Sequence, residues 1–320
     1  MIQVEGLTKY YGDFRAVDRV SFYADVGEIV GFVGRNGAGK TTTIRILTGY
    51  MPPTSGSAKV AGFDVFEQSL DVRRRVGYLP ETVPLYKEMT VWQYVNYMAS
   101  LRGMRNPERT QRVETVLDMV DMLDRENSLV ANISRGMRQR IGLAQSIVHN
   151  PDVLILDEPT AGLDPDQRIE MRETIREIGQ DRTVFLSSHD LAELEKLCTR
   201  ILVIDQGRIV AEDTPEALAG RLEGQNRFFI GLRGVDLAEA ATLIGKLPGV
   251  TAAMLTDKGI EVSSSKDVDA RPDVAAAVVK KKWELMELRP LAFSLEDIFL
   301  QLTGHDGDDE SKYADKDGEE

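Results

Sequence analysis

The chain has 320 residues and a single cysteine, Cys198, so no disulfide can form within it. This cysteine usage fits a reducing compartment. No stretch approaches the run of about 18 apolar residues that spans a bilayer as a helix, and a separate chain would have to do any spanning. The N-terminal segment MIQVEGLTKYYGDF has no basic start followed by an apolar core, so we expect no secretory signal.

The chain also has fewer basic than acidic residues, 39 against 52. The formal net charge of −13 makes the chain a poor binder of nucleic acid phosphate or anionic lipid through bulk charge. The last 17 residues, 304–320, hold eight acidic residues and two lysines but almost no apolar residues. We expect this tail to be a disordered, solubilising end, with a partner-binding tail as the alternative.

The length and the pattern of apolar residues predict the domains. At roughly 100–200 residues per domain, the chain should hold two domains, or one large domain with an appendage. Over residues 1–223 short apolar strands alternate with helical segments, which indicates an α/β domain with a largely parallel sheet. The expected strands are 2–7, 28–33, 57–60, 76–79, 153–156, 183–187 and 201–205.

Two parts of the chain depart from this alternation. Residues 90–149 read as helix after helix, with a capping-box pattern at Thr90 and Gln93, and we interpret residues from about 84 to 149 as an inserted helical subdomain. Residues 224–303 follow the order βαββαβα, which resembles a small ferredoxin-like α+β domain. The tail 304–320 completes the chain.

A phosphate-binding loop is the clearest motif. The string GRNGAGKTT follows an expected strand and opens a helix, and it matches G-x-x-x-x-G-K-[ST]. Its glycines let successive N–H groups converge on phosphate oxygens, and the helix N-terminus adds a positive dipole end. Lys40 should meet the β- and γ-phosphates, and the Thr41 hydroxyl should ligate Mg²⁺. The nucleotide-binding residues predicted here are Gly34, Arg35, Asn36, Gly37, Ala38, Gly39, Lys40, Thr41 and Thr42.

A second motif, VLILDEP at residues 153–159, supplies two carboxylates. Four apolar residues predict a buried strand that ends in Asp157, where an acid can hold the metal ion. Glu158 stands next to it and can polarise the attacking water as a general base.

Further motifs identify a family. ISRGMRQR at residues 133–140 resembles the signature of ATP-binding-cassette (ABC) ATPases, and AGLD at 161–164 resembles the loop after the second motif. SSHD at 187–190 places His189 as the switch histidine of that family, and Tyr11 resembles the aromatic residue that stacks on adenine. Six motifs in family order make residues 1–223 resemble an ABC ATPase, which implies a P-loop NTPase (RecA-like) core.

The resemblance implies a composite nucleotide site. In ABC ATPases each ATP is held by the phosphate loop of one subunit and the signature of another, so this chain should form a dimer, as a homodimer or with a related chain. The residues implied to face the partner's ATP are Ser134, Arg135, Gly136, Met137 and Asp164. His189 is implied to sense the γ-phosphate and orient water. Taken alone, Ser134 reads as a helix N-cap, and Tyr10 competes with Tyr11 for the adenine.

One position departs from the family pattern. The segment GYLPE carries Glu81 where the family usually has a metal-ligating glutamine. A carboxylate also ligates Mg²⁺, so metal binding should survive this change. GYLPE and the closing segment at 291–303 resemble an exporter subgroup that includes gliding-motility and copper-processing ATP-binding proteins.

These observations predict an ATP-hydrolysing subunit of an exporter. We expect it to lie at the cytoplasmic face of the membrane and to dock on a separate integral membrane permease, with no nucleic acid partner. Loop residues Leu85, Tyr86 and Met89 are the expected docking surface, and Trp92 is expected in the core. The alternatives are a soluble ABC ATPase that acts on nucleic acid or ribosomes, and a regulatory binder without turnover.

Overall fold

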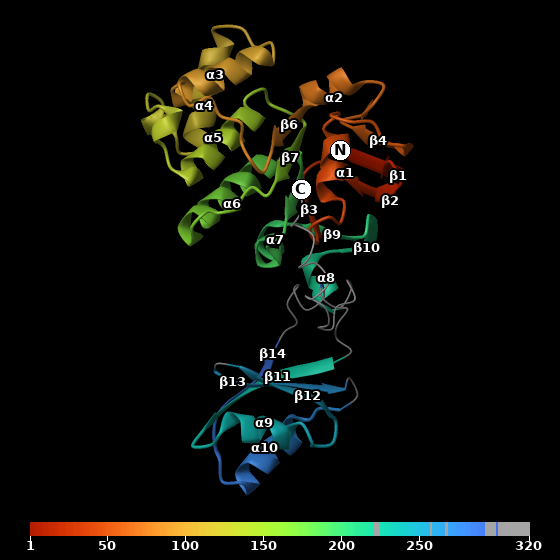
Figure 1. Cartoon of the computed structure of the whole chain (residues 1–320). Helices are drawn as coiled ribbons and strands as arrows, with labels where there is room; N and C mark the ends of the chain where they lie inside the picture. Colours follow the sequence, from red (N-terminus) through yellow and green to blue (C-terminus); the bar gives the residue numbers. More distant parts are fainter. Residues whose placement is uncertain (221–224, 257, 266–267, 292–298, 300–320) are drawn as a thin grey trace, which may run out of the picture. The chain divides into compact units, whose positions relative to one another are not determined.

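The computed structural model describes residues 1–220, 225–256, 258–265, 268–291 and 299. The chain divides into two compact units, Met1–Pro215 and Glu216–Glu320 (Figure 1). The boundary predicted from the sequence, after residue 223, falls among residues that lie outside the described part. Among the described residues, no helix combines the length and apolar character needed to cross a membrane.

A six-stranded sheet forms the centre of the first unit, in the order β10-β9-β3-β8-β7-β6. All its neighbouring strands run parallel except the β9–β10 hairpin. The strands β3, β7 and β8 are buried along their whole length, as expected for a sheet covered on both faces. The strands are β3 (Ile29–Gly34), β6 (Val76–Leu79), β7 (Val153–Asp157), β8 (Thr183–Ser188), β9 (Arg200–Asp205) and β10 (Arg208–Asp213).

The expected strands at 2–7 and 57–60 belong to a different sheet, which corrects the sequence-based expectation of one largely parallel sheet. This second sheet is antiparallel and has the order β2-β1-β4-β5. It packs on the parallel sheet through three aromatic rings, with Phe185 centred 5.4 Å from Phe22 and 5.2 Å from Phe32. Its strands are β1 (Ile2–Tyr11), β2 (Phe14–Ala24), β4 (Ser55–Val60) and β5 (Phe63–Asp64).

The inserted helices gather at one end of the first unit (Figure 1). They are α3 (Val91–Leu101), α4 (Glu108–Met119) and α5 (Arg135–Ile147), with short 3₁₀ turns at η1 (Leu123–Arg125) and η2 (Val130–Asn132). The predicted capping box is present, because the Thr90 hydroxyl accepts from the Gln93 N–H and the Gln93 side chain accepts from the Thr90 N–H. Trp92 is half-buried rather than in the core, where its neighbours Val91 and Tyr94 lie instead.

Of the remaining helices of the first unit, α6 (Pro165–Gly179) and α7 (Leu191–Leu197) connect strands of the parallel sheet, and α1 (Lys40–Leu47) and α2 (Ser69–Arg75) connect the two sheets. They are followed at the boundary of the two units by α8 (Pro215–Gly220). Cys198 follows α7 and is buried, and burial raises the pKa of its thiol.

The second unit has the strand order and the helix placement of a ferredoxin-like domain. Its antiparallel sheet has the order β12-β13-β11-β14, and its core includes side chains from both helices. The elements are β11 (Gln225–Arg233), α9 (Leu237–Ile244), β12 (Val250–Thr256), β13 (Gly259–Ser265), α10 (Arg271–Lys280) and β14 (Glu284–Leu291). The last helix of the predicted βαββαβα order, apart from Phe299, and the acidic tail fall outside the described residues.

Candidate nucleotide-binding site

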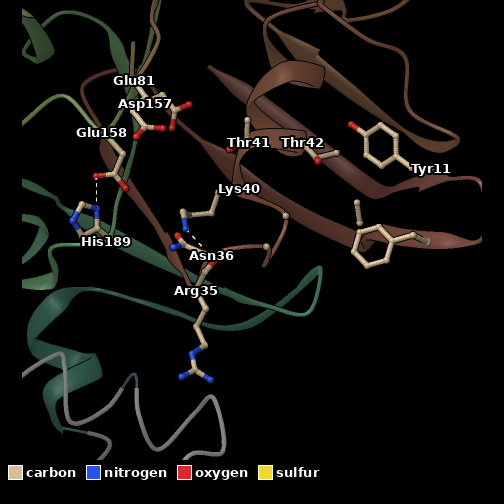
Figure 2. A pocket seen from close by; sticks show the side chains of 14 residues that line it. Tyr11, Arg35, Asn36, Lys40, Thr41, Thr42, Glu81, Asp157, Glu158 and His189 are labelled. Carbon is tan, nitrogen blue, oxygen red and sulfur yellow. Dashed lines mark hydrogen bonds and ion pairs between the residues drawn. The ribbon is translucent and has the colours of Figure 1, made fainter. Parts of the chain in front are cut away.

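A cavity of about 500 Å³ opens beside the phosphate loop (Figure 2). Five parts of the first unit supply its walls: the β1–β2 hairpin, the phosphate loop with the start of α1, the segment after β6, the end of β7 and the end of β8. The lining residues are Tyr11, Phe14, Ala16, Arg35, Asn36, Gly37, Gly39, Lys40, Thr41, Thr42, Glu81, Asp157, Glu158 and His189. The structure therefore brings residues far apart in the sequence to one site.

The phosphate loop is a cradle that only glycine can form at two positions. A Cβ atom on Gly34 would lie 2.4 Å from the carbonyl oxygen of Ile204. Gly39 has a φ of 109°, and a Cβ there would lie 2.5 Å from the carbonyl oxygen of Ala16. Helix α1 begins directly after this loop without a side-chain cap. Its first N–H groups and the cradle therefore fit a phosphate group.

Lys40 holds the loop together in this structure. Its Nζ donates to the carbonyl oxygen of Gly34 at 2.5 Å and to that of Arg35 at 3.2 Å. Burial lowers the pKa of Lys40, while the nearby carboxylates of Glu158, Asp157 and Glu81 oppose that shift. An arriving phosphate would offer this ammonium group a stronger, charged acceptor.

Asp157 and Glu158 stand at the carboxyl end of β7. The Ser187 hydroxyl of β8 donates to Oδ1 of Asp157 at 2.5 Å and fixes that carboxylate. Glu158 has a left-handed backbone, with a φ of 52°, which is uncommon for residues other than glycine. Its N–H donates to the Ser187 carbonyl oxygen at 3.1 Å, so the neighbouring strand holds this turn in place.

His189 and Glu158 meet across the cavity edge, as the dashed line in Figure 2 shows. Nδ1 of His189 lies 2.8 Å from Oε2 of Glu158. The His189 side chain is 69% exposed and the Glu158 side chain only 12%. Burial raises the pKa of Glu158, and the bond to His189 acts against that shift. A raised pKa makes the ionised carboxylate a stronger base.

The donor set fits a magnesium ion. Thr41, Glu81 and Asp157 line the same cavity and offer one hydroxyl and two carboxylates. Within the described residues, no group of three or more His, Cys, Asp or Glu side chains could hold a metal by itself. Mg²⁺ typically uses one or two carboxylates together with substrate phosphates and waters.

Two aromatic residues lie at the other end of the cavity. Tyr11 lines it, and Tyr10 is not among the lining residues. The Tyr11 hydroxyl approaches Sδ of Met51 at 3.2 Å. Phe14, paired with Tyr11 across the hairpin, also lines the cavity and is 64% exposed. Phe14 was not predicted from the sequence, because no motif marks it and only the hairpin register brings it beside Tyr11.

The signature segment does not line this cavity. Ser134 caps α5, its Oγ accepting from the Met137 N–H at 3.2 Å, and both residues line a second cavity of about 620 Å³. Asp164 caps α6 by accepting from the Gln167 N–H at 3.0 Å. Of the residues predicted to face a partner's ATP, none is among those that line the nucleotide cavity of its own chain.

Comparisons with known proteins identify the family. The family profile for the ABC transporter matches residues 17–161. The linearmycin resistance ATP-binding protein LnrL of Bacillus subtilis (strain 168) is 31% identical over 307 residues, which make up 95% of this chain and 98% of that protein. The Nod factor export ATP-binding protein I of Paraburkholderia xenovorans (strain LB400) is 34% identical over 313 residues, with 96% and 98% covered.

A solved structure, that of an ATP-binding subunit of an ABC transporter, has the same fold. It aligns with a TM-score of 0.64 at 30% identity and covers 75% of this chain and 97% of its own. The chain therefore belongs to the ABC transporter family as an ATP-binding subunit, and it is an ATPase. The predicted family, P-loop fold class and ATPase activity are confirmed.

Proposed function

We propose that two copies of this chain close on two ATP molecules, and that ATP hydrolysis powers export through a separate membrane permease. The composite site is inferred from the separation of the phosphate loop and the signature within one chain. Lys40, Glu158 and His189 line one cavity, whereas Ser134 and Met137 line another. A second copy supplies the missing signature to each nucleotide cavity, and a homodimer satisfies both at once.

Each residue then has a defined task. The N–H groups of the phosphate loop, together with Lys40, hold the β- and γ-phosphates. Thr41, Asp157 and Glu81 would hold Mg²⁺, which would neutralise charge on those phosphate oxygens when bound. Tyr11 and Phe14 offer apolar ring surface to the adenine. From the facing subunit, Ser134, Arg135, Gly136 and Met137 contact the γ-phosphate, and Asp164 lies close to it.

The chemistry follows from the Glu158–His189 pair. The Glu158 carboxylate takes a proton from a water molecule as that water attacks the γ-phosphorus, and the bond from the γ-phosphorus to ADP breaks. The bond between Nδ1 of His189 and Glu158 leaves Nε2 free, and Nε2, when it carries a proton, would donate to an oxygen of the γ-phosphate. The raised pKa of Glu158 suits it to this proton transfer.

A single variant tests this mechanism. Glu158→Gln keeps the shape of the side chain but removes the base, so turnover should fall by roughly 10²–10⁴-fold. ATP should still bind, and light scattering with ATP and Mg²⁺ should show a trapped dimer. The control Glu158→Gln/Lys40→Ala should stay monomeric. A monomer under saturating ATP would reject the composite site, and undiminished turnover would reject Glu158 as the base.

Export is supported by the relatives, one of which is named for Nod factor export and another for linearmycin resistance. The described part of the chain has no membrane-spanning helix, so we assign the membrane path to a separate permease. The chain would lie peripherally at the cytoplasmic face. Its net charge of −13 argues against a nucleic acid partner.

The docking surface for the permease lies around Tyr86. This side chain is 49% exposed, and its ring centres 5.8 Å from that of Tyr97 and 6.2 Å from that of Tyr94. One turn beyond Tyr97 on α3, Leu101 lines a cavity of about 680 Å³ whose walls combine apolar side chains such as Met98 with three arginines. Exposed apolar side chains such as those of Tyr86 and Leu101 are typical of a surface that receives a partner helix.

A further inference from the structure

Arg168, in the first turns of α6, bridges two loops that flank the nucleotide cavity. Its Nε donates to the carbonyl oxygen of Leu163 at 3.0 Å, and its Nη1 donates to Oδ2 of Asp190 at 3.1 Å. Leu163 lies between β7 and α6, and Asp190 lies between β8 and α7. Arg168 is not among the residues described as lining the cavity, so any effect on hydrolysis must pass through these partners.

The Asp190 end of this bridge fixes the backbone that carries His189. Oδ1 of Asp190 accepts from the Glu193 N–H at 3.1 Å and caps α7. The Asp190 N–H donates to the Ser188 hydroxyl at 2.9 Å. The residues on both sides of His189 are therefore held to each other and to the start of α7.

The Leu163 end connects to Glu158 and to the signature. The Ala161 N–H donates to the Glu158 carbonyl oxygen at 3.1 Å, so the loop turns directly out of the catalytic residue. Gly162 has a φ of 70°, and a Cβ there would lie 2.3 Å from Cζ of Arg135. The guanidinium group of the signature residue Arg135 thus packs on the loop that Arg168 grips.

A neighbouring contact repeats this link between the signature and α6. A Cβ on Gly136 would lie 2.3 Å from Oε1 of Gln167, the residue before Arg168. Two successive side chains at the start of α6 therefore contact different partners. Gln167 contacts the signature, and Arg168 contacts the histidine loop, residues 188–190.

We propose that Arg168 is a positioning residue that sets the orientation of His189 toward Glu158. It does so by tying the loop that carries His189 to the 161–164 loop, against which the signature packs. This inference rests on the proposed roles of His189 and Glu158. One guanidinium group holds Leu163 and Asp190 together, so a shift of the 161–164 loop is passed to the start of α7. Without the Arg168 guanidinium group, the loop that carries His189 keeps its fold but is no longer tied to the 161–164 loop and, through that loop, to the signature.

The chain offers a matched control in Arg172, one turn further along α6. Nη1 of Arg172 lies 3.2 Å from Oε1 of Glu193, and the two side chains are only 13% and 12% exposed. This ion pair ties the same two helices together but bonds neither Leu163 nor Asp190. A merely structural role for the α6–α7 ion pairs would make the loss of Arg172 at least as harmful as the loss of Arg168.

The test compares steady-state ATPase kinetics of the full chain. Arg168→Gln should lower kcat roughly 10- to 100-fold, the size of loss expected from a small misplacement of a reacting group. Its KM for ATP should stay within about twofold, since the phosphate loop is untouched. Arg172→Gln should lower the melting temperature but leave kcat near the wild-type value. Wild-type kcat in Arg168→Gln, or an equal loss of kcat in both variants, would overturn the proposal.

A double variant separates this inference from the proposed function. If Arg168 acts through His189, then His189→Ala and His189→Ala/Arg168→Gln should turn over ATP at the same low rate in single-turnover assays. A further loss in the double variant would overturn the proposal. If His189→Ala itself retains full turnover, the proposed role of His189 fails. If it loses turnover while Arg168→Gln does not, only the positioning role fails.

Discussion

His149 is a histidine whose burial should make the fold sensitive to acid. Its Nε2 lies 3.1 Å from the Val76 carbonyl oxygen, a bond that the Nε2–H of the neutral ring donates. Burial, with help from the charges of Arg102 and Arg112, lowers its pKa from 6.5 to about 4. The unfolded chain takes up this proton below pH 6.5, and the folded chain only near pH 4.

We therefore predict that stability falls as the pH drops from 6.5 to 4. Since one pKa unit corresponds to about 1.4 kcal/mol, the full loss from this group is about 3 kcal/mol. Thermal unfolding at a series of pH values measures it. His149→Gln keeps a donor for Val76 but does not titrate, so its stability should change less over this range. Parallel curves for the variant and the wild type would contradict the assignment to His149.

Tyr11 and Phe14 should share the binding of the adenine ring. Loss of a stacked aromatic ring costs about 1–3 kcal/mol in base recognition. Tyr11→Ala should therefore weaken ATP binding by roughly tenfold or more in calorimetry or with a fluorescent analogue, and Phe14→Ala should also weaken it. Tyr10→Ala is the matched control, because Tyr10 is similarly exposed but is not among the residues lining the cavity. Equal effects at Tyr10 and Tyr11 would remove the hairpin from the adenine site.

Single residues show how much of the site can be predicted from the sequence alone. The phosphate loop is contiguous and its spacing encodes its geometry, and seven of its nine predicted residues, all but Gly34 and Ala38, line the cavity. Phe14 could not be predicted in this way, because its place depends on the register of a hairpin. Arg168 stands outside every motif, and its contact with Asp190 depends on how two helices pack.

At the scale of elements, the position of a strand was easier to predict than the strands with which it pairs. The bounds expected for β6 match the structure, since a short apolar run between turns marks a buried strand. Strand β2 was missed, because the polar Asp18 is buried and the aromatic Tyr23 is exposed, which obscures the alternation of a half-buried strand. The assignment of β1 and β4 to a second sheet depends on pairing between distant segments, which a local pattern does not encode.

The segment before α3 carries a prediction about the membrane partner. Tyr86→Asp should leave the isolated protein folded and able to bind ATP, because the side chain is half exposed. Co-purification with the permease should fail, since the charge would be unpaired in an apolar contact. The control Val26→Asp places the same charge at a site that is 65% exposed, in the turn between β2 and β3. If Tyr86→Asp co-purifies and supports transport, the permease docks elsewhere.

At the scale of the whole molecule, the two compact units should be separable. The second unit has its own core, which includes Phe228, Ile230 and Val274, and none of the phosphate motifs. We predict that residues 1–223 alone bind ATP and that residues 224–303 fold as a fragment. Calorimetry with ATP and circular dichroism of the two fragments measure this. A complete loss of ATP binding by the first fragment, rather than of regulation or assembly, would contradict the division.

The strand order of the parallel sheet has a consequence for synthesis on the ribosome. Strand β3 ends at Gly34, yet its neighbours β8 and β9 begin at Thr183 and Arg200. A ribosome that adds 5–20 residues per second needs roughly 10–30 s to cover that interval. Throughout it the nascent chain holds an apolar strand with two unpaired edges, which favours protection by a chaperone. The phosphate loop is therefore among the first parts of the protein to be translated and among the last to take its final shape.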